Sequence, residues 1–190
     1  MDITKHLEVE IKFALRNPHE TLDFLQKNGT FIKETFQKDT YFLPPNKDYT
    51  AEKPITKWLR IRESDKGDSI NYKDWALKEG VNQNYCDEFE SHIDSVEDVK
   101  KIFGVLDIKP LIVVNKKRKI FMYKDIEIAL DEVDELGWFI ELEAKWEFAS
   151  IEDARAHLYK IAEEMWTQLA DQDQKWYPYV LLEKKGLIKN

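Results

Sequence analysis

Residues 7–13 have the sequence LEVEIKF, which alternates strictly between apolar and charged side chains. Successive side chains of a β-strand point to opposite faces, so this stretch predicts a strand with one apolar face and one charged face. The charged face carries Glu8, Glu10 and Lys12. The fold must therefore place three charges on the side of the strand that does not pack on the core.

Later segments also place charged residues two positions apart. Their charged faces carry Arg60 and Arg62, Lys116 and Arg118, and Glu141 and Glu143 with Lys145. Each face could simply meet solvent, which is ordinary in an antiparallel sheet. The charges nevertheless separate into acidic and basic pairs, and inward-facing pairs would need counter-charges. A polyphosphate together with Mg²⁺ or Mn²⁺ would supply both, because arginine and lysine bind phosphate and carboxylates bind hard cations.

The remaining patterns predict further strands and several helices. Strands are expected over 31–43, 58–63, 69–78, 84–93, 112–123, 126–133 and 138–148, and helices over 18–28, 95–104, 150 to about 169, and 178–185. Residues 46–56 are expected to form a polar loop. About eight antiparallel strands with about four helices indicate an α+β fold, and closing the sheet into a barrel would remove its edges.

Length and composition limit the classes of protein to consider. A chain of 190 residues suits one domain spanning residues 1–190. The net charge of −8 disfavours nucleic acid and anionic membrane as partners. Cys86 is the only cysteine, and neither a signal peptide nor a membrane span is expected, because no long apolar stretch occurs. A cytoplasmic location is therefore expected.

The stretch Glu8-Val9-Glu10-Ile11-Lys12 resembles the ExExK signature of the CYTH family. These triphosphate tunnel enzymes include class IV adenylyl cyclases, thiamine triphosphatases and inorganic triphosphatases. The resemblance continues in order through LRIR at 59–62, YK at 72–73, KKR at 116–118, LD at 130–131, and Gly137 followed by ELE at 141–143. This ordered set spans most of the chain.

The resemblance implies an eight-stranded antiparallel β-barrel, a triphosphate tunnel with flanking helices, whose lumen carries these side chains. By family likeness, the triphosphate would be held by Lys12, Arg60, Arg62, Lys73, Lys116 and Arg118. One or two Mg²⁺ or Mn²⁺ ions would be held by Glu8, Glu10, Asp131, Glu141 and Glu143. The catalytic group would comprise Glu8, Glu10, Lys12 and Lys73. Glu88 and Glu90 occupy further acidic positions, whereas Cys86 stands where some relatives carry a basic residue.

Three functions are compatible with these residues. The first is a metal-dependent triphosphatase acting on tripolyphosphate, thiamine triphosphate or a nucleoside triphosphate. The second is a class IV adenylyl cyclase, because KDTYFLPP at 38–45 looks like a stretch in the cyclase-like branch. The third is a non-catalytic triphosphate-binding module, although anion binding alone needs no carboxylate pairs. A homodimer through the outer face of the barrel is left open.

Aromatic residues gather near the end of the chain, at Trp166, Trp176, Tyr177 and Tyr179. They could stack on a base, but aromatic side chains near a C-terminal helix more often pack a core or an interface. We expect packing.

Overall fold

One antiparallel sheet organises the structure, a computed structural model that describes residues 7–53, 55–75, 85–145, 148–165, 169–172 and 176–188. Its strands are β1 (Leu7–Leu15), β2 (Thr30–Leu43), β3 (Lys57–Ser64), β4 (Asp68–Trp75), β5 (Tyr85–Ile93), β6 (Lys109–Tyr123), β7 (Ile126–Val133), β8 (Gly137–Ala144) and β9 (Leu169–Gln172). The helices are α1 (Pro18–Asn28), α2 (Val96–Val105), α3 (Ile151–Glu164), α4 (Tyr177–Lys184) and the short 3-10 helix η2 (Tyr49–Ala51).

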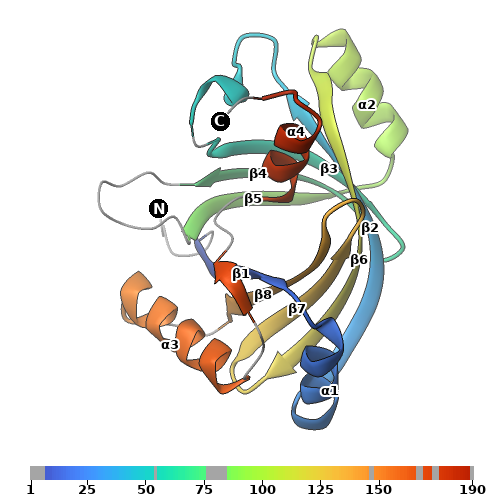
Figure 1. Cartoon of the computed structure of the whole chain (residues 1–190). Coiled ribbons are helices and arrows are strands. Elements are labelled where there is room, and N and C mark those ends of the chain that lie inside the picture. Colours follow the sequence, from blue (N-terminus) through green and yellow to red (C-terminus); the bar gives the residue numbers. More distant parts are fainter. Residues whose placement is uncertain are drawn as a thin grey trace.

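The sheet closes into a barrel, as the sequence predicts. Its strand order is β5-β4-β3-β2-β6-β7-β8-β1-β9, and β1 also pairs with β5. Closure occurs where Glu8 lies opposite Cys86 and Val9 lies opposite Tyr85. Figure 1 shows these strands curving around a common interior. The expected eight-stranded antiparallel barrel with flanking helices is therefore confirmed.

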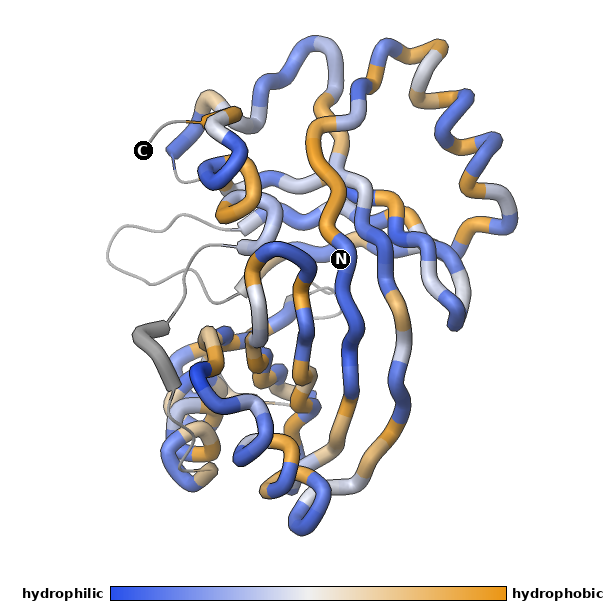
Figure 2. Tube along the Cα trace, turned by 45° about the vertical axis from the view of Figure 1, so that its right-hand side comes forward, coloured by the Kyte–Doolittle hydropathy of each residue, from blue (hydrophilic) through white to orange (hydrophobic). Residues whose placement is uncertain are grey.

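One hydrophobic cluster lies on the outside of the barrel wall, beneath α3. Val9 and Ile11 of β1 pack with Ile140 and Leu142 of β8 in a cluster that also includes Leu158 of α3. The intervening residues of these strands are charged, and the trace in Figure 2 shows hydrophilic and hydrophobic positions following one another along the chain. Because one face of the wall packs under α3, the other face is left to line the interior.

Helix α4 lies against the concave side of the sheet (Figure 1). Its buried Tyr177 and Leu181 join Trp58 of β3, Trp75 of β4 and Phe139 of β8 in one cluster. Each of these strand residues lies two positions from a lumen charge on its own strand. Its side chain therefore points to the same face as that charge. Helix α4 therefore fills part of the barrel interior with apolar side chains and confines the charged region to the remainder.

Several element boundaries differ from the sequence expectation. The helix expected to reach about residue 169 ends at Glu164, and 169–172 instead form β9. This strand pairs with the part of β1 that β5 does not cover, with Phe13 opposite Gln172 and Leu15 opposite Leu169. Unpaired backbone groups on a strand edge need partners, which favours pairing of 169–172 with the free edge of β1. The expected strand residues 76–78, 84 and 146–147 and the expected helical residues 166–168 lie outside the described residues.

The loop expected at 46–56 contains η2, whose Tyr49 is buried. Among the helices of the described segments, none is long and apolar enough to cross a membrane.

Candidate functional site

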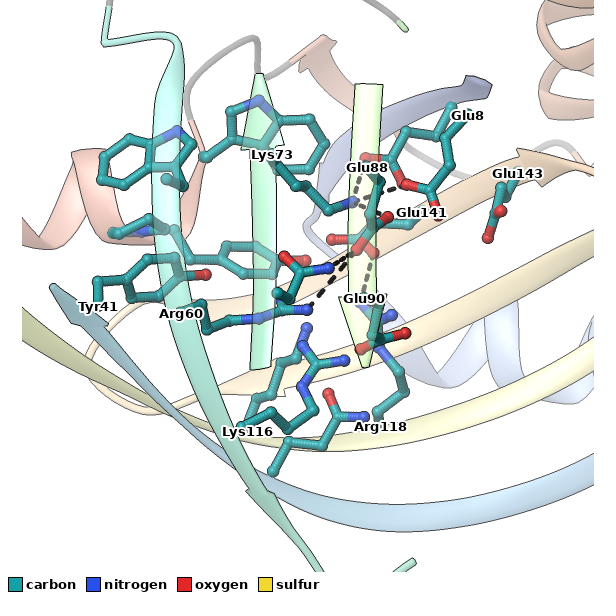
Figure 3. Close-up of a pocket in the computed structure, with 18 of the residues that line it drawn as sticks. Glu8, Tyr41, Arg60, Lys73, Glu88, Glu90, Lys116, Arg118, Glu141 and Glu143 are labelled. Atoms are coloured by element: carbon teal, nitrogen blue, oxygen red, sulfur yellow. Dashed lines mark hydrogen bonds and ion pairs between the residues drawn. The ribbon is translucent and has the colours of Figure 1, made fainter. Parts of the chain in front are cut away.

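A cavity of about 280 Å³ occupies the barrel interior and is lined by charges of both signs (Figure 3). Its basic residues are Lys33, Arg60, Arg62, Lys73, Lys116 and Arg118. Its acidic residues are Glu8, Glu10, Glu88, Glu90, Glu127, Glu141 and Glu143. Because the two signs are almost balanced, the cavity suits neither an anion alone nor a cation alone.

Strand register brings these charges together. Glu10 lies directly opposite Glu143, and Lys73 lies directly opposite Glu88. Directly opposed side chains in an antiparallel pair have Cβ atoms about 4.5–5.5 Å apart, so register alone makes such residues neighbours. Alternation along each strand turns the charged side chains to the interior, and the register between strands then places them next to one another.

One basic region lies on β3, beside a buried carboxylate of β2. Arg62 donates from Nε to Asp39 Oδ1 and from Nη2 to Oδ2, both at 2.7 Å. Arg60 Nη1 donates to Asp39 Oδ2 at 3.4 Å. Burial alone would raise the pKa of Asp39, but the charges of Arg62 and Arg60 outweigh it and hold that pKa well below its usual value. Asp39 is therefore ionised and keeps both guanidinium groups in place.

The second basic region lies on β6, beside Asp131 of β7. Arg118 donates from Nε to Asp131 Oδ1 at 2.7 Å and from Nη2 to Oδ2 at 2.5 Å. Lys116 Nζ and the Tyr177 hydroxyl also donate to Oδ2, at 3.3 and 3.0 Å. Arg118 also contacts Glu141. Burial and the neighbouring Arg118 charge lower the pKa of Lys116 to about 8.

The acidic region surrounds Lys73 of β4. Lys73 Nζ lies 2.7 Å from Glu8 Oε2, 3.0 Å from Glu88 Oε2 and 3.9 Å from Glu10 Oε1. Burial disfavours the Glu8 carboxylate, but the Lys73 charge dominates with the help of hydrogen bonds and lowers the pKa of Glu8 to about 2. One carboxylate of the group is thus held ionised near neutral pH.

Glu10 has the opposite behaviour. It is 7% exposed, and burial raises its pKa to about 8, with further contributions from the Glu141, Glu8 and Glu143 carboxylates. Its Oε1 has no hydrogen-bond partner in the described structure. A buried carboxylate oxygen without a donor, close to other carboxylates, fits a site for a divalent cation. A second group that could hold a metal ion comprises Glu8, Cys86 and Glu88, whose ligand atoms lie within 4.8 Å of one another.

Most of the site residues expected from the sequence meet in this cavity. The exceptions are Lys12 and Asp131, which are buried but do not belong to its described lining. Lys12 Nζ lies 4.4 Å from the ring centroid of Tyr177 and 5.0 Å from that of Trp176. The roles assigned to these residues in substrate and metal binding stay predictions.

Some residues at the site were missed from the sequence. The sequence did not single out Asp39, which holds the cavity residues Arg60 and Arg62 through hydrogen bonds. The expectation that the C-terminal aromatic residues pack is confirmed for Tyr177 and Tyr179, which are buried, whereas Trp166 lies outside the described residues. Tyr177 additionally lines the cavity and donates to Asp131, and no local pattern in the sequence signals this contact.

Comparisons with known proteins agree with this arrangement. The CYTH domain family model matches residues 6–177. A Methanocaldococcus jannaschii protein named "Putative adenylate cyclase" is 34% identical over 138 residues, covering 72% of this chain and 76% of that protein. The solved structure of the PH1819 protein from Pyrococcus horikoshii is similar with a TM-score of 0.79 and 27% identity, covering 93% of this chain and 99% of that one.

A more distant structure shares the fold. It is a Hippeastrum "Putative adenylyl cyclase" described as having a dominant triphosphatase activity, with a TM-score of 0.61 and 17% identity over 94% of this chain and 96% of that one. The family model and the M. jannaschii relative, taken with the barrel and its charged lumen, show that this chain belongs to the CYTH domain family.

Proposed function

We propose that this protein is a metal-dependent triphosphatase that hydrolyses a small triphosphate inside the barrel. The observation that carries the proposal is the meeting of basic and acidic groups in one cavity inside the barrel. A triphosphate complements the basic groups, and a divalent cation complements the acidic ones. Phosphoryl transfer depends mainly on positioning and charge neutralisation, so such a cavity suits it without a protein nucleophile.

The basic residues would bind the triphosphate. Arg60, Arg62, Lys116 and Arg118 present their charges from two strands, and guanidinium groups make forked hydrogen bonds with phosphate oxygens. Lys12 and Lys73 complete the set implied by family likeness. Burial in the barrel strengthens these interactions, because the surroundings screen charge less than water does.

The metal would be held by carboxylates of β1 and β8, namely Glu8, Glu10, Glu141 and Glu143. A bound Mg²⁺ or Mn²⁺ would supply charge neutralisation at the phosphate oxygens. Glu10 must give up its proton to act as a ligand, whereas Glu8 is already ionised. Lys73 orients Glu8 and Glu88 through its two short contacts.

An adenylyl cyclase is the second candidate, and a specific observation supports it. The M. jannaschii relative carries a cyclase name, and the partly exposed Trp176 gives the cavity aromatic surface that could receive a base. We rank hydrolysis first because the Hippeastrum protein, named in the same way, is described as having a dominant triphosphatase activity. A cyclase name is therefore compatible with hydrolysis in this fold.

Product analysis by chromatography separates the candidates. The protein is incubated with tripolyphosphate, thiamine triphosphate or ATP, each with and without Mg²⁺ or Mn²⁺. We expect metal-dependent orthophosphate release by the unmodified protein and by Glu20→Gln, a change at an exposed position of α1, but not by Glu10→Gln. Cyclic AMP with pyrophosphate from ATP would identify a cyclase. Binding without any product would favour the non-catalytic module.

A further inference from the structure

The same arrangement of charges occurs twice in the barrel wall. On β2, Asp39 lies directly opposite Arg62 of β3. On β7, Asp131 lies directly opposite Arg118 of β6. In both places a second cation, Arg60 or Lys116, precedes the arginine by two residues and shares its face. Each pair of cations therefore has its own aspartate on a neighbouring strand.

The contacts repeat as well. Each aspartate accepts from Nε and Nη2 of its arginine at 2.5–2.7 Å, and each accepts a longer bond from the preceding cation, at 3.4 Å from Arg60 and 3.3 Å from Lys116. Both carboxylates are buried, with 1% of Asp39 and none of Asp131 exposed. A two-point contact fixes the plane of a guanidinium group, which a single contact would leave free to turn.

The oxygens of Asp131 are already in use. They accept from two nitrogens of Arg118, from Lys116 and from Tyr177, and a carboxylate offers about four lone-pair sites. Three of these donors, Arg118 Nη2, Lys116 and Tyr177, meet at Oδ2, so a cation that bound this oxygen would have to displace at least one of them. Glu10 differs, because its Oε1 is buried without a hydrogen-bond partner.

We propose that Asp39 and Asp131 are equivalent positioning residues that aim Arg60, Arg62, Lys116 and Arg118 at the triphosphate, and that neither aspartate is a metal ligand. Family likeness implies a metal-binding role for Asp131. We assign it a positioning role instead, because its contacts match those of Asp39. The inference rests on the proposed function in taking a triphosphate as the ligand.

Neutralising an aspartate should change the affinity for an anion in opposite directions, depending on whether the aspartate acts through its charge alone or by positioning the arginine. Asp39→Asn or Asp131→Asn makes the cavity more positive by one charge, so charge alone would tighten binding of an anion. Loss of positioning weakens binding instead, because the arginine loses its orientation and must be ordered by the ligand. We expect each change to raise the Kd for tripolyphosphate about 10-fold or more, the range for lost hydrogen bonds to charged groups.

The experiment measures two affinities on each variant of the full chain. Tripolyphosphate binding is measured by calorimetry in EDTA, where no metal contributes, and Mn²⁺ binding is measured by electron paramagnetic resonance without phosphate. We expect both aspartate variants to lose tripolyphosphate affinity and to keep Mn²⁺ affinity within about 2-fold of the unmodified protein, since the metal is held by other carboxylates. Asp23→Asn, at an exposed position on α1, is the matched control and should change neither.

Three results would overturn the proposal: unchanged or tighter tripolyphosphate binding, a selective loss of Mn²⁺ affinity in Asp131→Asn, or parallel loss of both affinities, which would indicate a structural role. If an asparagine variant does not fold, Arg62→Lys and Arg118→Lys take its place, because they keep the charge and remove the fork. They should show the same selective loss, and normal tripolyphosphate binding by both would refute the proposal. Product formation is not measured, so failure of the triphosphatase proposal would be seen separately.

Discussion

Replacing Glu10 with glutamine should remove a large pH dependence of stability in the metal-free protein. Burial and neighbouring carboxylates raise the pKa of Glu10 from its usual value of 4.5 to about 8. The folded protein therefore binds a proton more tightly at this site than the unfolded chain does. As pH rises from 4.5 to 8, the unfolded chain loses this proton first, so the free energy of unfolding falls.

The size of the effect follows from the two pKa values. A tenfold difference in proton affinity is worth about 1.4 kcal/mol. Compared with a side chain that stays protonated, Glu10 lowers the free energy of unfolding by about 1 kcal/mol at pH 5 and by about 4 kcal/mol at pH 8. Glutamine has the shape of the protonated side chain and does not ionise. Glu10→Gln should therefore exceed the stability of the unmodified protein by about 1 kcal/mol at pH 5 and by about 4 kcal/mol at pH 8.

Urea unfolding of both proteins in EDTA at pH 5, 6, 7 and 8 measures this difference. Glu88, with its pKa raised to about 7 by burial and by Glu8, gives a trend of the same sign, and Lys116, with its pKa lowered to about 8, gives one of opposite sign above that pH. Both groups are present in the two proteins, so their effects largely cancel in the comparison. Glu20→Gln should follow the unmodified protein. Parallel curves for the unmodified protein and Glu10→Gln would refute the reasoning.

Three further changes test other parts of the structure. Lys73→Met removes the charge that holds the Glu8 pKa near 2, so that pKa should rise above 4.5, measured by carboxyl-carbon NMR; an unchanged value would contradict the assigned ion pair. Tyr177→Phe leaves Asp131 with one donor fewer and should lower the free energy of unfolding by about 1–3 kcal/mol in urea; no loss would mean that this hydrogen bond is unimportant. Leu158→Ala opens a cavity under α3 and should lower the free energy of unfolding by about 2–5 kcal/mol. Product formation well below the melting temperature should stay unchanged. Lost activity in the folded variant would contradict the separation of this core cluster from the lumen.

The sequence predicts the parts of this site that depend on alternation. Glu8 and Glu10 share a face because they are two residues apart on a strand, and the same holds for Arg60 and Arg62. Which face turns inward does not follow from alternation alone, because a solvated face would look the same. The ordered likeness to a family supplied that step, and these charged side chains do line the cavity inside the barrel.

The sequence does not predict contacts that arise only when distant segments meet. Asp39 lies in a stretch of mixed polar and aromatic residues. Its contact with Arg62 is evident only from the strand register, which places the two residues opposite each other. Tyr177 reaches Asp131 because α4 enters the barrel interior, which no local pattern indicates. Residue 169, expected at the end of a helix, instead belongs to a strand that pairs with the free edge of β1.

The origin of the oxygen in the product tests the central claim most directly. The protein is incubated with ATP or tripolyphosphate and Mg²⁺ in water enriched in oxygen-18, and the products are analysed by mass spectrometry. The account predicts orthophosphate carrying one oxygen-18 atom, because water attacks phosphorus, and no such product from Glu10→Gln. Unlabelled pyrophosphate with cyclic AMP, or no Mg²⁺-dependent product from either substrate, would contradict it.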